Sequence, residues 1–333
     1  MTEPAATTES RFRVGVDLGG TNIQSGVIDP GGQIVGRDKR KTDADSGSDG
    51  VVDRLVVSVQ AACADAGVTI DQLSAIGVGA PGPVDEPKGM VLEAVNLRWE
   101  NMPLGSILSE RLGAPVGLSN DANAGMIGEH RLGAARGTQH AMGVWVGTGV
   151  GGALVINGSL HTGAFHTAGE IGHVLTDPWA PPGARSLEQA CSRTAIVERL
   201  RKLIRANHPS ALVDISGGRL NKIKSRHLLE AYTSGDPLVI EVVDDAAYRL
   251  GVAIGGFVTM LSLECVVLGG GLTEAMGELL VATVRRGVQR TAFPDACKAV
   301  RVVESELGDD AGILGAALLG ADQVAQTKEP AGA

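Results

Sequence analysis

The sequence predicts an α/β protein built from two related α/β domains. From Phe12, the stretch "FRVGVDLGGTNIQSGVI" alternates apolar residues on both sides of a glycine turn, which is typical of two strands joined by a tight turn. The stretch "AMGVWVGTGVGGALVI" repeats this unit from Ala141, about 130 residues later. The second half of the chain adds helical periodicity between its strands. A duplicated pair of domains would account for this order, with a phosphate between the two glycine turns.

Local patterns predict the other elements in chain order. After the first hairpin, "DPGG" predicts a turn and "QIVGRDK" a third strand. We expect a helix over Val52–Ala66 that ends at Gly67, and "LSAIGVGAPGPVD" predicts a buried strand running into a Pro/Gly turn. The stretch "LSNDANAG" predicts a strand followed by a helix over Ala122–Arg131, and "ECVVLGGGL" predicts a later strand. Further helices are expected over Leu187–Ala206, Ser225–Thr233, Pro237–Leu263, Gly277–Thr291 and about 308–325.

The expected domain boundary lies at the strand–helix junction in "LSNDANAG". Residues 12–121 would form a small α/β domain, completed by the C-terminal helix at about 308–325. Residues 122–307 would form a large α/β domain. We expect residues 1–11 and 326–333 to be disordered.

Composition excludes several classes of function. The net charge is −9 without a basic run, which argues against nucleic acid and anionic membranes as partners. Aromatic residues make up only 3%, too few for base-stacking platforms. The four cysteines are widely spaced, which disfavours disulfides and a Cys-rich zinc site. With no apolar run of the roughly 18 residues that a membrane helix needs, and no signal peptide in "MTEPAATTES", we expect a cytoplasmic protein.

Two glycine turns are candidate phosphate sites. In "DLGGTN", Gly19 and Gly20 let the backbone approach an anion, and Asp17 could hold Mg²⁺ beside it. The turn "VGTGVGG" offers a second such site. The alternative is that both are plain hairpin turns. Neither matches the P-loop or the Rossmann fingerprint, because neither leads directly into a helix.

Two polar clusters are candidates for chemistry. Asp121 follows a strand and precedes a helix, so it could be a general base for a hydroxyl proton or only a helix N-cap. The stretch "AGEIGHVLTDPWAPPGARSLEQACS" carries Glu170, His173 and Glu188. These side chains could form a metal site, a polar pocket for a small molecule, or a solvated loop.

The motifs together carry a family resemblance. In order, they are "VDLGGTN", "GVGAPGPVD", "SNDANAG", "VGTGVGGAL", "AGEIGH", "SLEQACS", "VVLGGG" and "DDAGILGAAL". This ordered set resembles the ROK family of bacterial sugar kinases, repressors and related proteins, over about Val14–Leu319. The resemblance implies an actin-like (ribonuclease H-like) fold with two α/β domains flanking a cleft. It also implies ATP-dependent phosphorylation of a hexose, first of all of glucose to glucose 6-phosphate.

The resemblance assigns roles by motif position. Asp121 would be the catalytic base in a Mg²⁺-assisted, in-line phosphoryl transfer. The residues implied to bind the sugar are Gly82, Asn120, Asp121, Glu170, His173 and Glu188. Those implied to bind the nucleotide are Asp17, which would also meet Mg²⁺, Gly19, Gly20, Thr21, Gly147, Thr148, Gly149, Gly269, Gly270 and Gly271.

Several alternatives stay open within this resemblance. The sequence does not separate glucose from fructose, mannose or N-acetylhexosamines, nor ATP from polyphosphate as the donor. A non-catalytic, sugar-sensing regulator is disfavoured, because family repressors place a helix-turn-helix before the first motif and only about a dozen residues precede it here. A fold that has lost catalysis is disfavoured because the acidic residues persist. The expected partners are a sugar, a nucleotide and, as is usual for the family, a second copy of the chain.

The sequence departs from the family pattern in two places. Many members carry CxCGxxGCLE, whose cysteines hold a structural zinc together with a histidine, but this chain has "PWAPPGARSLE" and we expect no zinc. His173 would then need another partner to fix its tautomer. The second departure is "GAFHTAGE", where Phe165 and His166 replace the small or amide residues that are common in the family. We interpret His166 as a loop or subunit-contact residue rather than a ligand.

Overall fold

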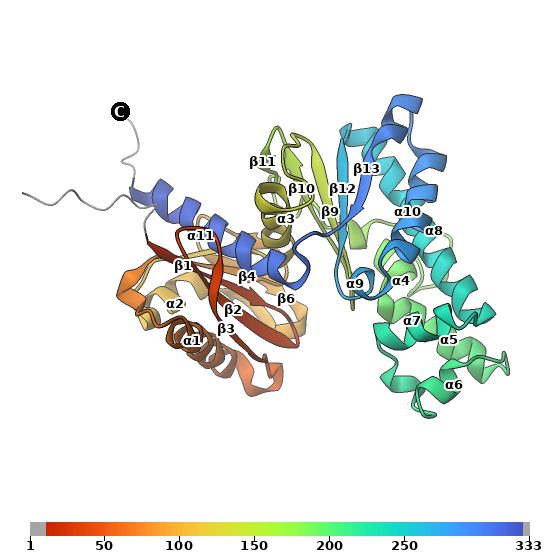
Figure 1. Cartoon of the computed structure of the whole chain (residues 1–333), viewed down its shortest axis with the longest axis horizontal. Helices are drawn as coiled ribbons and strands as arrows, with labels where there is room; N and C mark the ends of the chain where they lie inside the picture. Colours follow the sequence, from red (N-terminus) through yellow and green to blue (C-terminus); the bar gives the residue numbers. More distant parts are fainter. Residues whose placement is uncertain (1–10, 329–333) are drawn as a thin grey trace, which may run out of the picture. The chain divides into compact units, whose positions relative to one another are not determined.

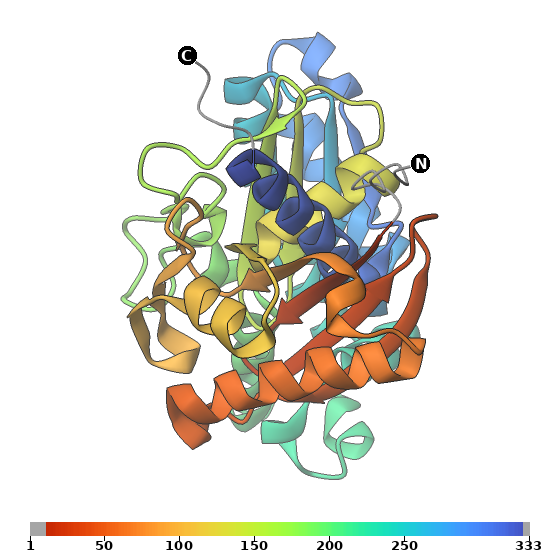
Figure 2. The same ribbon diagram turned by 90° about the vertical axis from the view of Figure 1, so that its left-hand side faces the viewer.

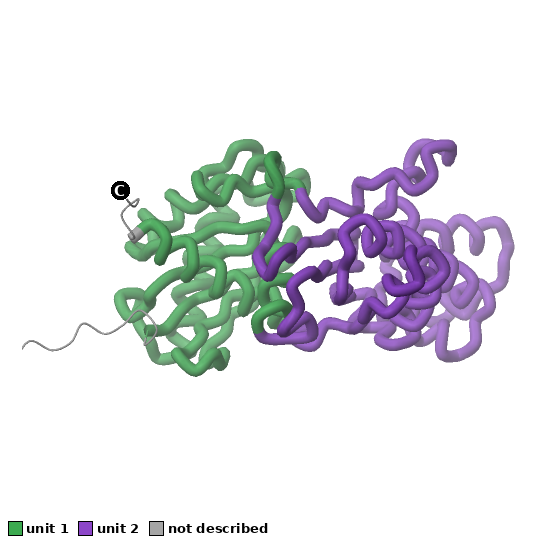
Figure 3. The backbone as a smooth tube through the Cα atoms, turned by 90° about the horizontal axis from the view of Figure 1, so that it is seen from above, with its two compact units in different colours: residues 1–131, 163–167, 309–333 green, residues 132–162, 168–308 purple. Residues whose placement is uncertain are grey.

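The computed structural model describes residues 11–328, which form two compact units. Among the described residues, unit 1 holds residues 11–131, the short segment Gly163–Thr167 and residues 309–328, whereas unit 2 holds Leu132–Thr162 and Ala168–Gly308 (Figure 3). The helix after "LSNDANAG" therefore groups with unit 1, although the expected division was at residue 121. Of the end segments predicted to be disordered, residues 1–10 and 329–333 lie outside the described residues. Residues 326–328 contradict the prediction, because they form the end of the last helix.

Unit 1 is built on a five-stranded sheet with the strand order β3-β2-β1-β4-β8 (Figure 1). The strands are β1 (Phe12–Leu18), β2 (Asn22–Ile28), β3 (Ile34–Lys41), β4 (Leu73–Ala80) and β8 (Val116–Asn120). The first three pair antiparallel as predicted from the turns, and β1, β4 and β8 run parallel. A smaller sheet contains β5 (Val84–Asp85), β6 (Met90–Ala94) and β7 (Trp99–Met102).

Helices cover both faces of the large sheet in unit 1 (Figure 2). The helices of unit 1 are α1 (Gly47–Ala66), α2 (Leu104–Leu112), α3 (Asp121–Leu132) and α11 (Ala311–Lys328), and α3 packs against α11. Helix α1 packs on β2 and β3, and α11 packs on β1, β4 and β8. The contact with α11 requires glycine, because a Cβ atom on Gly15 or Gly77 would lie 1.8 Å from a carbonyl oxygen of α11. The last helix of the chain is therefore part of the first unit.

Unit 2 repeats the hairpin-plus-parallel-strand arrangement, in the order β11-β10-β9-β12-β13. The strands are β9 (Ala141–Val146), β10 (Val150–Ile156), β11 (Ser159–Leu160), β12 (Cys265–Gly269) and β13 (Arg301–Glu304). The helices are α4 (Leu187–Cys191), α5 (Arg193–Arg205), α6 (Leu212–Ile215), α7 (Ser225–Thr233), α8 (Pro237–Leu261), α9 (Thr273–Met276) and α10 (Glu278–Thr291). One buried apolar cluster joins the sheet to α8 and α10, so the α/β class is confirmed.

One predicted helix is wrong in its continuity. The segment expected to be a single helix from Leu187 to Ala206 is two helices, α4 and α5, separated at Ser192. Ser192 has an extended backbone, and its side chain accepts a hydrogen bond from the backbone N–H of Ala195, at 3.1 Å. A serine that caps the second helix thus interrupts a run whose apolar periodicity continues through it. The break determines where α5 begins, which matters for the site below.

Candidate functional site

The sugar-site candidates of unit 1 lie where its parallel strands end. Strands β1, β4 and β8 are neighbours, with Asp17 opposite Gly79 and Ala80 opposite Asn120. The carboxyl ends of parallel strands are where ligands usually bind in open α/β sheets. The sheet thus brings the first glycine turn, the Pro/Gly turn and the "SNDANAG" motif to one edge.

Asn120 links the Pro/Gly turn to the start of α3. Its Nδ2 donates to the carbonyl oxygen of Gly82 at 3.0 Å, and its Oδ1 accepts from the N–H of Asn123 at 3.1 Å. Asn120, rather than Asp121, therefore caps the helix. It still has one N–H and one lone pair for a ligand. Gly82 has a φ of +82°, and a Cβ atom there would lie 1.9 Å from a carbonyl oxygen, so the turn requires glycine.

Asp121 is the first residue of α3. Its Oδ1 accepts a hydrogen bond from the N–H of Ala122 at 2.8 Å. A Cβ atom on Gly79 would lie 3.3 Å from the Cα of Asp121, so the helix start packs closely on β4. These contacts hold the carboxylate of Asp121 at the end of the sheet, beside Asn120.

Sequence reasoning missed Glu86, which contacts the first residue of the "SNDANAG" motif, Ser119. The Ser119 hydroxyl donates to Oε1 of Glu86 at 2.5 Å. Burial raises the pKa of Glu86, and the Ser119 bond, the charge of His166 and a bond from Gln323 oppose this. Glu86 lies 33 residues from Ser119 in the chain, so no local pattern could have paired them.

The first glycine turn joins β1 to β2. The N–H of Gly19 donates to the carbonyl of Asn22 at 2.9 Å, and the Thr42 hydroxyl donates to the carbonyl of Gly19 at 2.6 Å. Gly20 and Thr21 are exposed at the tip. Burial raises the pKa of Asp17 to about 6; Asp309 adds to the shift and Lys39 opposes it. Neighbouring carboxylates that repel each other in this way suit a divalent cation, so Asp17 fits a Mg²⁺ ion carried by a nucleotide.

In unit 2 the other two glycine motifs meet at the end of the second sheet. Gly147 to Gly149 join β9 to β10, and Gly269 at the end of β12 lies opposite Trp145 of β9. Gly270 has a φ of +85°, and a Cβ atom there would lie 2.8 Å from the backbone of Val146. The backbone is therefore closely packed, and these turns provide N–H groups of the kind that bind phosphate.

The start of α5 abuts the turn at Gly147–Gly149, which sequence reasoning also missed. The N–H of Arg193 donates to the carbonyl of Gly147 at 2.9 Å, and its guanidinium donates to the Thr148 hydroxyl at 3.0 Å. The hydroxyl of Thr194 donates to the carbonyl of Thr148 at 2.7 Å. The break at Ser192 is what places this cation, because in one continuous helix Arg193 would lie in mid-helix rather than at the start.

His173 and Glu188 each lie within electrostatic reach of Glu170. Burial raises the pKa of Glu170, His173 lowers it and Glu188 raises it further. Oε2 of Glu188 accepts from the N–H of Val150 at 2.9 Å and would lie 2.2 Å from a Cβ atom on Gly149. Glu188 thus connects Glu170 and His173 to the second glycine turn, although Glu188 lies far from Gly149 and Val150 in the sequence.

Backbone hydrogen bonds hold the loop between His173 and Glu188. Leu175 and Ser186 form a β-bridge. The N–H of Thr176 donates to the carbonyl of Arg185 at 2.9 Å, and the N–H of Leu187 donates to the carbonyl of Val174 at 2.9 Å. In the described residues, no three His, Cys, Asp or Glu side chains group as a metal site. The two ends of the loop therefore pair as a short antiparallel ladder.

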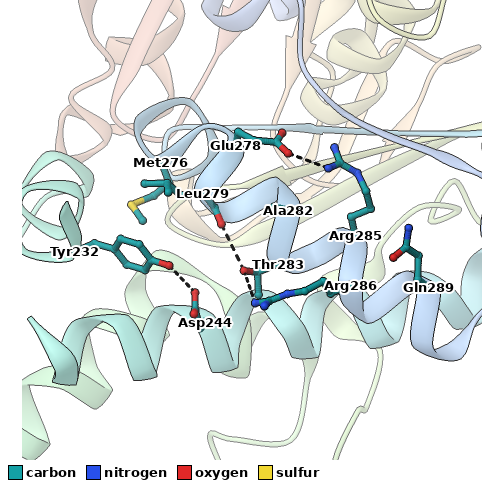
Figure 4. Close-up of a pocket in the computed structure, with 10 residues that line it drawn as sticks. All are labelled: Tyr232, Asp244, Met276, Glu278, Leu279, Ala282, Thr283, Arg285, Arg286 and Gln289. Atoms are coloured by element: carbon teal, nitrogen blue, oxygen red, sulfur yellow. Dashed lines mark hydrogen bonds and ion pairs between the residues drawn. The ribbon is translucent and has the colours of Figure 1, made fainter. Parts of the chain in front are cut away.

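A groove elsewhere in unit 2 contains none of the predicted site residues (Figure 4). Its volume is about 660 Å³, and it is lined by α8, α10, Tyr232 of α7 and Met276 of α9. The Tyr232 hydroxyl donates to Asp244 at 2.9 Å, and Arg285 pairs with Glu278 at 2.8 Å. Its polar groups thus largely satisfy one another.

Comparison with known proteins places this geometry in a family. The ROK family profile matches residues 13–323. The chain belongs to the ROK family. It is 35% identical to the glucokinase of Thermotoga maritima, over 91% of this chain and 95% of that protein. A ROK family glucokinase from Streptomyces griseus, solved in complex with glucose and AMPPNP, is 31% identical with a TM-score of 0.83, covering 93% of this chain and 99% of that one.

The ROK family also contains regulators that resemble this chain. A xylose repressor from Caldicellulosiruptor bescii is 28% identical over 72% of this chain and 60% of its own length. The structural likeness to the glucokinase confirms the actin-like fold that the motifs predicted. Across residues 11–328, no helix has the length and apolar character required to cross a membrane.

Proposed function

We propose that this sugar kinase transfers the terminal phosphoryl group of ATP to the 6-hydroxyl of glucose. The observation that carries the proposal is the Asn120–Asp121 turn, held at the end of β8 by the bond to Gly82. The likeness to two glucokinases, one solved with glucose and AMPPNP, supports the choice of sugar and donor.

In the proposed reaction, unit 1 supplies the base. Asp121 accepts the proton of the attacking hydroxyl as the new P–O bond forms. Asn120 binds a neighbouring hydroxyl through its remaining N–H and lone pair. Because buried polar groups must be satisfied, a sugar lacking the matching hydroxyl leaves them unpaired and binds poorly.

Unit 2 supplies phosphate and sugar contacts. The N–H groups of Thr148 and Gly149 and the guanidinium of Arg193 bind the phosphates, and Gly269–Gly271 approach the adenosine, while the N–H of Gly147 donates to the carbonyl of Gly149 and holds the turn. Glu170, His173 and Glu188 bind sugar hydroxyls. Mg²⁺ held near Asp17 would neutralise charge on the transferred group when the nucleotide is bound.

Replacing Arg193 with glutamine tests the phosphate role of α5. We expect the KM for ATP to rise about tenfold and the KM for glucose to stay within about twofold, because a charge-assisted bond to phosphate is lost. Arg193→Lys keeps the charge and should recover part of the effect. Arg199→Gln is the control, since Arg199 lies on the same helix but pairs with Asp245. An unchanged KM for ATP in Arg193→Gln would remove this contact from the mechanism.

A substrate panel tests the function itself. Purified protein is assayed with glucose, fructose, mannose and N-acetylglucosamine, each with ATP or polyphosphate, and the phosphorylated carbon is assigned by NMR. We expect the highest kcat/KM for glucose with ATP, and phosphate on carbon 6. Preferred phosphoryl transfer to another hexose would show that glucose is the wrong substrate assignment. Sugar binding without transfer to any sugar would contradict a kinase and favour a sensor.

A further inference from the structure

His166 has an unusual position in the chain. The segment Gly163–Thr167 groups with unit 1, whereas the residues on both sides of it belong to unit 2. Within this segment, His166 is half-buried while its neighbour Phe165 is 81% exposed. The imidazole, rather than the larger aromatic ring, is the side chain that this segment places into unit 1.

The backbone of His166 is strained. Its φ is +58°, in the left-handed region that glycine adopts without cost and histidine does not. Glycines occupy positive φ on either side of it, at Gly163 and Gly169. A non-glycine residue in this conformation is retained where the surrounding structure holds it, and such residues cluster at functional sites.

The surroundings of the imidazole are acidic and not fully satisfied. Its Nδ1 is buried and has no hydrogen-bond partner in the described structure. The charge of His166 lowers the pKa of Asp85 and that of Glu86. Asp85, however, is already paired with Lys88 at 2.7 Å. Glu86 is therefore the carboxylate left for His166, and its other partners are Ser119 and Gln323.

We propose that His166 is a positioning residue for the sugar site, acting through Glu86 on the turn that carries Asn120 and Asp121. The charge of His166 lowers the pKa of Glu86, which burial raises, and Glu86 accepts the Ser119 hydroxyl directly before that turn. A neutral carboxylic acid would lose this charge-assisted bond. The inference rests on the proposed function, because it names what aligns the base of that reaction.

Substitutions at His166 separate this role from a structural one. In His166→Gly the backbone strain is relieved but the charge is lost. We expect the Tm to rise, the KM for glucose to rise about tenfold and the KM for ATP to stay within about twofold. Without the imidazole the pKa of Glu86 rises, so the acidic limb of kcat/KM for glucose should move to higher pH by roughly one unit.

Matched variants complete the test. His166→Asn tolerates the same φ without the charge and should behave like His166→Gly. His161→Asn, at an exposed histidine, should behave like the wild type. Glu86→Gln should mimic the loss, and adding His166→Gly to it should cost no more, because the two act as one unit. A lower Tm with unchanged KM and unchanged pH profile would show a purely structural residue and overturn the proposal.

Glucose titration by calorimetry without ATP distinguishes this inference from the proposed function. If the wild type binds glucose but transfers no phosphate, the kinase assignment fails. A roughly tenfold weaker Kd for glucose in His166→Gly would even then support the positioning role. An unchanged Kd together with an unchanged pH dependence of binding would overturn it.

Discussion

Replacing Asp121 with asparagine is expected to lower kcat by roughly 10²–10⁴-fold, the range that a positioned general base contributes. The amide keeps the size of the carboxylate, and its oxygen can still accept the hydrogen bond from Ala122. It cannot take the proton of the sugar hydroxyl. The KM for glucose should therefore change little while kcat falls. Steady-state kinetics of the purified variant, with the Tm measured beside it, checks this.

Asp49 provides the matched control for Asp121. It lies in the first turn of α1, also in unit 1, and is exposed. Asp49→Asn should leave both kcat and KM unchanged. If Asp121→Asn were as active as the wild type, another group would have to accept the proton. If its Tm fell by many degrees, the loss of activity would count as misfolding and the assignment would rest on the KM for glucose.

The second large effect is expected from Asp17→Asn, which should raise stability and abolish the kinase reaction. The folded-state pKa of Asp17 is raised from 3.8 to about 6, mainly by burial. The folded protein therefore binds this proton more tightly than the unfolded chain does. Below about pH 4 the carboxyl is protonated in both states and costs nothing. Above pH 6 it must be ionised in the fold, which costs up to about 3 kcal/mol.

Denaturant unfolding at several pH values measures this cost. Between pH 4 and pH 7 the wild type should lose up to about 3 kcal/mol more unfolding free energy than Asp17→Asn does. Asp29→Asn, at an aspartate in the β2–β3 turn, should follow the wild type. Kinase activity should fall by orders of magnitude in Asp17→Asn, because the proposed mechanism gives Asp17 the role of the carboxylate that would hold Mg²⁺. An equal pH dependence of stability in both proteins would contradict the raised pKa.

Local signals in the sequence were enough to predict the two strand–turn–strand units and their glycine turns. Each strand–turn–strand unit lies within a short segment, so its alternation and turn residues can be read directly. The parallel strands then carry the motifs to shared edges. Asp17, Gly82 and Asn120 lie far apart in the chain, yet strand pairing and the Asn120–Gly82 bond gather their elements at one edge.

Features that depend on distant partners could not be predicted in this way. The separation of α4 from α5 depends on Ser192 capping a helix inside a run with continuous apolar periodicity, and on the Arg193 N–H reaching Gly147. The role of Glu86 depends on its contact with Ser119. The support of the proline-containing loop could not be predicted either, because its ends pair through backbone groups, which every sequence possesses and no pattern of side chains reveals.

The close packing of α11 on Gly15 and Gly77 constrains the order in which the two units can fold during synthesis on the ribosome. Unit 1 draws on the beginning of the chain and on the stretch from Asp309 onward, with nearly all of unit 2 between them. Its sheet is synthesised early but must wait for α11, leaving glycine-rich apolar surface uncovered in the meantime. Unit 2, which is continuous apart from one short excursion, can fold while the ribosome is still completing α11. Unit 1 is thus the first unit whose synthesis begins and the last to complete its fold. We expect chaperone dependence to be greatest for nascent chains stalled before residue 309.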